Sequence, residues 1–201
     1  MTGPLLTLLI FVIPAVSASA DGAPAVSARD EAYRKAEAKR LSDELEKLVR
    51  RQAWAGAART YAELEALGLP LGVDELYAGA LTARQLGEMA LVYERLLAAA
   101  KLDGRREIVE WLWAIDTGYG RVTVAGDPAA PPTLTAEAPP LLPEQRACIE
   151  TAQRHLTETG RFDGLLPAGA YRVNGVPVEV IPGEDPVVLD LTPAPSGRRR
   201  R

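Results

Sequence analysis

The sequence predicts an α+β protein with two parts: an N-terminal antiparallel helical hairpin bundle over 27–117 and a small β-rich, sandwich-like module over 118–192. Three observations lead to this class. Apolar residues recur at three- and four-residue intervals through the first part, as on helices that share a core. Alternating apolar and polar residues replace that period after Gly118-Tyr119-Gly120. One further helical stretch, 143–159, is inserted in the second part and opens on a proline.

An apolar run precedes the helical part. Leu5 to Val16 is apolar, and Ala18-Ser19-Ala20 follows the small-x-small pattern of signal peptidase sites. The run is shorter than the roughly 20 apolar residues that cross a bilayer. We therefore expect 1–20 to be a cleaved signal peptide, with an uncleaved membrane anchor or a buried helix as the alternatives. The abundance of Ala, Arg, Pro, Gly and Leu is typical of GC-rich bacteria, so the expected location is periplasmic or secreted.

Composition narrows the classes of function. Charged residues make up 25% and apolar residues 47% of the 201-residue chain, as in ordinary globular proteins. A net charge of −4 argues against nucleic acid as a partner. A single cysteine, Cys148, excludes an internal disulfide. We expect Cys148 to be buried, and a free thiol or a bond to another chain are the alternatives.

The helical part divides into amphipathic stretches. Ser27 and Asp30 have the spacing of a capping box that opens the first helix, and Gly56 predicts the turn after it. The expected inner stripe of the first helix is Ala36, Leu41, Leu45, Leu48 and Gln52. The second stripe is Ala58, Tyr61, Leu64 and Leu67, closed by Gly68 and Pro70. In the closing helix, "REIVEWLWAID", the inner residues are Ile108, Leu112 and Ile115, with Trp111 beside them and Trp113 on the flank.

Two passages resemble the second half of a tetratricopeptide repeat. In "AWAGAARTYAELEALGLP" the family's small, aromatic and apolar positions fall on Ala57, Tyr61 and Leu64, with Pro70 near the closing proline. In "LGEMALVYERLLAAAKLD", about 32 residues later, they fall on Met89, Tyr93 and Leu96, with Gly87 at the turn. The resemblance implies two degenerate units, 41–67 and 76–100, that stack on each other. It also implies a groove for a peptide or partner protein, and packing without any partner is the alternative.

The β-rich part contains the clearest local signal in the chain. Asn174-Gly175 predicts a type I′ hairpin, since both central residues of that turn need positive φ. A two-residue turn pairs Val173 with Val176, Tyr171 with Val178, and Gly169 with Val180, which places the large apolar residues on one face. Pro177 lacks an N–H donor and makes the second strand an edge. Other expected strands are 121–126, 133–138 and 187–191, the last pairing elsewhere.

This part also carries a family resemblance. "LPAGAYRV", the hairpin and "VEVIPGEDPVVLDL" resemble PEGA-type and carboxypeptidase regulatory-like modules of exported bacterial proteins. Such modules are spacers or surfaces for protein or glycan contact. The resemblance therefore implies an alternative function, a glycan-binding envelope module, which requires exposed aromatic rings beside the hairpin.

Few residues are suited to catalysis. Cys148 and His155 lie two helical turns apart and cannot touch, and one Cys with one His is too few for a metal site. The acidic residues Asp163, Glu184, Asp185 and Asp190 fit turns better than a Ca²⁺ loop. We therefore expect no enzyme, cofactor or metal, but a non-enzymatic exported scaffold or protein-interaction protein. A hydrolase remains a third reading, and it requires two carboxyl groups facing each other in a cleft.

The expected contact residues lie in two places. The flanks around Trp54, Tyr77 and Trp113 are the predicted surface for a protein or peptide partner. The segment 193–201 is expected to be a disordered tail that ends in Arg198, Arg199, Arg200 and Arg201. These arginines predict weak contact with an anionic membrane surface, at about 1 kcal/mol each. A solvated tail without a partner is the alternative.

Overall fold

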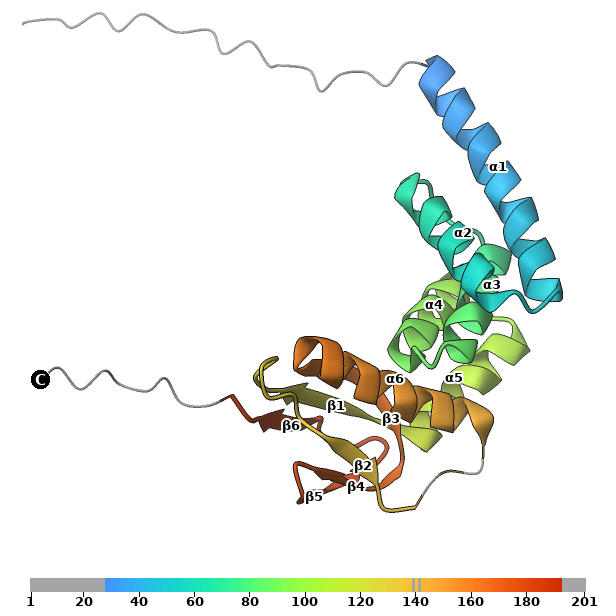
Figure 1. The fold of residues 1–201 in the computed structure, drawn as a ribbon. Helices are drawn as coiled ribbons and strands as arrows, with labels where there is room; N and C mark the ends of the chain where they lie inside the picture. Colours follow the sequence, from blue (N-terminus) through green and yellow to red (C-terminus); the bar gives the residue numbers. More distant parts are fainter. Residues whose placement is uncertain (1–27, 139, 141, 193–201) are drawn as a thin grey trace, which may run out of the picture.

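The computed structural model describes residues 28–138, 140 and 142–192 and confirms the α+β class, with a helical part followed by two small sheets (Figure 1). The predicted signal peptide, the residue Ser27 of the predicted capping box and the arginine-rich tail lie outside the described residues.

Five helices come first along the described chain. They are α1 (Ala28–Arg50), α2 (Trp54–Ala66), α3 (Val73–Gln85), α4 (Met89–Leu102) and α5 (Arg106–Gly118). Short connections join α1 to α2 and α3 to α4, and each of these pairs packs together as a hairpin (Figure 1). The second hairpin packs on the first through α3, and α5 packs on α4.

The predicted turn at Gly56 is wrong, because Gly56 lies inside α2 against the side chain of Leu48. The chain reverses instead at Gln52, which takes a left-handed φ of 56°, while the Ala53 N–H donates to the Leu48 carbonyl at 2.9 Å. Gly87, with a φ of 77°, does the same between α3 and α4, as predicted.

The predicted inner stripe of α1 is correct only over its second half. Gln52 lies beyond the end of α1, in the turn to α2, and is exposed there. Leu41 and Leu45 are buried, but Ala36 is exposed. The reason is length: α1 has 23 residues and α2 has 13, so the first turns of α1 extend past α2 (Figure 1). Ion pairs one turn apart, such as Glu31–Lys35 at 2.7 Å, suit such a solvated helix.

The second part of the chain forms two three-stranded sheets. Its elements are β1 (Tyr119–Ala125), β2 (Leu134–Ala136), α6 (Pro143–Thr159), β3 (Arg161–Pro167), β4 (Gly169–Val173), β5 (Val176–Val180) and β6 (Val187–Asp190). The first sheet has the order β3-β1-β6, with β1 antiparallel to β3 and parallel to β6. The second is the antiparallel sheet β2-β4-β5. Helix α6 packs on β3 and β2, and its predicted ends are confirmed.

The hairpin prediction is confirmed in detail. β4 and β5 pair in the predicted register, and φ is 49° at Asn174 and 81° at Gly175. Tyr171, Val173 and Val180 are buried. β5 pairs only with β4 among the described strands, as expected from Pro177.

The two sheets meet at a corner of the chain. Only Ala168 separates β3 from β4, so the polypeptide passes from one sheet to the other within a single residue. The Tyr171 hydroxyl donates to the Pro167 carbonyl at 2.8 Å, and the Ala168 N–H donates to the Gly118 carbonyl at 2.9 Å. These bonds hold the corner against the end of α5.

One hydrophobic core connects the helical part with both sheets. It includes Ala80 of α3, Leu96 of α4, Ile115 of α5, Leu156 of α6 and Val122 of β1, each at most 2% exposed. A smaller, separate cluster lies between α1 and α2 and consists of Leu41, Leu45, Ala57, Tyr61 and Leu64. The chain runs directly from α5 into β1, so the two parts share their core at the junction.

Candidate functional site

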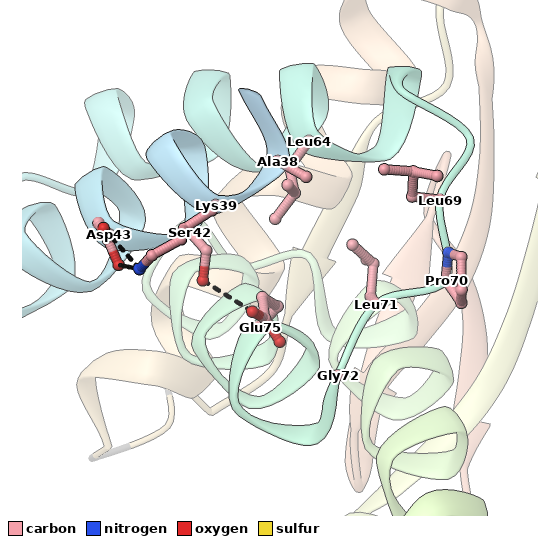
Figure 2. Close-up of a pocket in the computed structure, with 10 residues that line it drawn as sticks. All are labelled: Ala38, Lys39, Ser42, Asp43, Leu64, Leu69, Pro70, Leu71, Gly72 and Glu75. Atoms are coloured by element: carbon pink, nitrogen blue, oxygen red, sulfur yellow. Dashed lines mark hydrogen bonds and ion pairs between the residues drawn. The ribbon is translucent and has the colours of Figure 1, made fainter. Parts of the chain in front are cut away.

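A groove lies between α1 and α3, the first helices of the two hairpins. It begins as a cavity of about 280 Å³ bounded by these helices and by the loop between α2 and α3 (Figure 2). Its apolar lining comes from Ala38, Leu64, Leu69, Pro70 and Leu71. Its polar lining comes from Lys39, Ser42, Asp43 and Glu75. We call this cavity the apolar pocket.

A second cavity continues the groove along α1. It has a volume of about 320 Å³ and shares Ser42 and Glu75 with the apolar pocket. Leu45 and Ala78 line it together with Glu46 and Asp74. We call it the acidic pocket, because three of its six lining residues carry carboxylates.

A hydrogen bond stands between the two pockets. Ser42 Oγ donates to Glu75 Oε1 at 2.7 Å and ties α1 to α3 (Figure 2). Lys39 Nζ is paired within α1 with Asp43 at 3.2 Å. Because this pair is exposed, it costs little to separate, and the rim can rearrange around a ligand.

An aromatic contact fixes the spacing of the helices below the groove. The Tyr61 ring of α2 lies directly on Gly79 of α3, where a Cβ would come within 2.2 Å of Tyr61 Cε2. The Arg95 guanidinium stacks on the same ring at 3.9 Å from its centroid and donates to the Gly79 carbonyl at 2.8 Å. Arg95 was not predicted, since a single arginine in an apolar helix has no local signature.

The three predicted contact residues are not brought together and do not line the groove. Trp54 is half-buried at the start of α2, and Trp113 is 68% exposed on α5. Tyr77 is half-buried and packs edge-to-face on Trp111, with ring centroids 5.8 Å apart. Tyr77 therefore supports the junction between α3 and α5, and of the three predicted contact residues Trp113 alone presents a largely exposed ring.

The Trp111 contact extends to α6. The Arg84 guanidinium lies 5.3 Å from the centroid of the Trp111 ring and pairs with Glu144 at 2.8 Å. Backbone hydrogen bonding at the start of α6, and then the Arg84 pair, lower the pKa of Glu144. These contacts join the helical part to α6 at the surface above the common core.

The reactive side chains lie apart from the groove. Cys148 is 1% exposed, its thiol donates to the Leu165 carbonyl at 3.0 Å, and burial raises its pKa to about 12. The thiol therefore stays protonated at neutral pH. His155 Nε2 lies 3.3 Å from Oε1 of Glu88, the residue before α4, and neither residue lines the groove.

Two of the predicted acidic residues of the β part, Asp163 and Asp190, have local partners. Asp163 lies 3.2 Å from Arg121 across the β1–β3 pair. Asp190 accepts from the Thr192 hydroxyl and N–H, and these bonds lower its pKa. No three His, Cys, Asp or Glu side chains gather as possible metal ligands in residues 28–138, 140 and 142–192.

The aromatic rings of the β part do not form a platform. Tyr171 and Phe162 are 3% and 8% exposed, and Tyr119 is half-buried. The described part of this module therefore has no exposed aromatic ring beside the hairpin, which the glycan-binding alternative requires.

No protein-family model, no curated protein and no solved structure matches this chain. Among the helices that the structure describes, none combines the length and the apolar character needed to cross a membrane.

Proposed function

We propose that this protein is a non-enzymatic scaffold or interaction protein that binds an extended peptide segment of a partner in the α1–α3 groove. The observation that carries the proposal is the pair of adjoining pockets, one with five apolar lining residues and one rich in carboxylates, on either side of the Ser42–Glu75 bond. The resemblance to tetratricopeptide repeats supports the same face, since α1 and α3 are the first helices of the two units.

The two pockets define the peptide that fits. An apolar side chain buried among Leu64, Leu69 and Leu71 contributes about 1.5–3 kcal/mol. A neighbouring Lys or Arg faces Glu46, Asp74 and Glu75, although Asp74 is shared with Arg105 at 2.8 Å and Glu46 with Arg50 at 3.6 Å. Exposed charge pairs contribute at most about 1 kcal/mol each, so the basic side chain fixes the direction of the peptide more than its affinity.

The first test blocks the groove. Peptides are selected from a randomised library on the full chain, and their affinities are measured for Ser42→Arg, which places a long cation between the pockets. We expect at least about tenfold weaker binding, because the apolar anchor and the basic contact are both obstructed. Ala36→Arg is the matched control, since Ala36 is exposed on the same helix and lies outside both pockets.

Two results would contradict the proposal. One is a library that yields only peptides whose affinity is the same for Ser42→Arg and for Ala36→Arg. The other is a set of selected peptides without a recurring apolar residue near a basic one. The circular dichroism of both variants checks that the helices are retained.

We also propose that the protein works in the bacterial periplasm or outside the cell. The support is the apolar run Leu5–Val16, followed by Ala18-Ser19-Ala20. The intact mass of the protein recovered from the native envelope fraction should correspond to a chain that begins at Asp21. Recovery of the uncleaved chain from the cytoplasm would contradict this proposal.

A further inference from the structure

A different cavity lies at the junction of the helical part and the sheets. Its volume is about 360 Å³, within the range of small-ligand sites. Five segments bound it: α4, α5, β1, β3 and the loop between β5 and β6. Its lining shares no residue with the α1–α3 groove. We call it the junction cavity.

The body of the junction cavity is apolar and aromatic. Ile115 and Leu165 line it together with the rings of Tyr93 and Tyr119. Burial raises the pKa of Tyr119 to about 12, and hydrogen bonding to Asp116 raises the pKa of Tyr93. Both rings are therefore neutral at physiological pH, and their faces attract cations.

The charges of the cavity are unbalanced. Glu94, Asp116 and Glu184 line it, and none of the three forms an ion pair with another described residue. Its one basic residue, Arg121, is held by the Asp163 carboxylate at 3.2 Å.

We propose that the junction cavity binds an organic cation, a primary ammonium or guanidinium group attached to an apolar body. The apolar body fits between Ile115, Leu165 and the tyrosine rings, and the cation meets the carboxylates of Asp116 and Glu184. Carboxylate and phosphate ligands are disfavoured by the same three acids. A free amine and a basic side chain of a peptide share this chemistry. The inference does not depend on the peptide groove.

The experiment uses the full chain and two small probes of the same shape. Phenethylamine carries the ammonium group and 2-phenylethanol is its neutral counterpart, and both are titrated while the amide NMR spectrum is recorded. We expect phenethylamine to shift resonances of residues around 90–94, 115–121 and 183–184. The alcohol should bind at least about fivefold more weakly, which corresponds to about 1 kcal/mol at an exposed site.

Charge removal gives the second readout. The double variant Asp116→Asn with Glu184→Gln keeps the shape of the rim, and it should bind phenethylamine about fivefold more weakly while binding the alcohol unchanged. Glu158→Gln removes an exposed acid on α6 and should leave both affinities as they are. Equal affinities for amine and alcohol, no binding of the amine at millimolar concentration, or an amine affinity unaffected by the double variant would each overturn the proposal.

A competition titration with a basic peptide shows whether the bound cation is a basic side chain or a free amine. The peptide TPAPSGRRRR, which has the sequence of residues 192–201, is titrated against the complex with phenethylamine. Displacement of the amine with shifts of the same resonances assigns the cavity to basic side chains. Failure of the peptide to displace a bound amine assigns it to free amines. The Ser42→Arg variant should bind phenethylamine normally, so the two sites are tested separately.

Discussion

Gly79 shows how a single missing side chain sets the distance between two helices. The Tyr61 ring fills the space where a Cβ of residue 79 would lie, and the Arg95 guanidinium stacks on a face of the ring. The Tyr61 hydroxyl is buried without a hydrogen-bond partner, and burial raises the pKa of Tyr61 to about 12. Leaving that hydroxyl unpaired costs about 1–3 kcal/mol, which the packing of the ring must offset.

Gly79→Ala is therefore expected to destabilise the protein by up to about 2 kcal/mol, because overpacking of a tight contact costs about 1–3 kcal/mol. The intrinsic helix preference of alanine over glycine, about 1 kcal/mol, acts in the opposite direction and is outweighed. The free energy of unfolding, measured by urea titration at 222 nm, checks the sign. A more stable Gly79→Ala variant would show that the contact has room for a methyl group.

Two further variants distinguish the contribution of the Tyr61 ring from that of its hydroxyl. Tyr61→Leu combined with Gly79→Ala should recover part of the loss, because the shorter side chain leaves room for the new Cβ. Tyr61→Phe alone should leave stability unchanged or raise it, since the unpaired hydroxyl is removed and the ring stays.

At the scale of elements, structure that is fixed by neighbouring residues could be predicted from the sequence. Structure that depends on contacts between distant residues could not. The β4–β5 hairpin followed from Asn174-Gly175, because the turn itself fixes the register. Strand β3 was not predicted, although Phe162, Gly164 and Leu166 alternate and are buried. Gly164 breaks the apolar pattern, and only the fold shows that the Phe162 ring covers it at a distance that a Cβ would not tolerate.

The same limit applies to the groove. Ser42 and Glu75 lie 33 residues apart, and neither belongs to a motif, so their contact depends on how the first hairpin packs on the second. The predicted contact residues Trp54, Tyr77 and Trp113 are all aromatic. One of them, Tyr77, packs on Trp111 instead of lying free. Aromatic composition predicted where large side chains occur but not which helix covers them.

At the scale of the molecule, the boundary between the two hydrophobic clusters does not coincide with the residue where the sequence periodicity changes. The change from helical to alternating period falls at 118, yet the large hydrophobic cluster continues across that point from α3 to β5. The separate cluster lies between α1 and α2. The least connected unit is therefore the first hairpin, held to the rest by the Tyr61–Gly79–Arg95 contact, the Ser42–Glu75 bond and the packing of Leu71 and Ala78 on its cluster.

This division predicts two levels of opening in native-state hydrogen exchange. Amides of α1 and α2 should exchange through an opening of lower free energy than amides of α4 and β1, which need the whole large core to unfold. Leu45→Ala should lower protection by about 2–5 kcal/mol in α1 and α2, which open first. Ile115→Ala should lower protection by a similar amount in α3, α4, β1 and β3 together. If Ile115→Ala lowered protection in the helices while β1 and β3 kept theirs, the helical and β parts would be separate folding units despite their continuous packing.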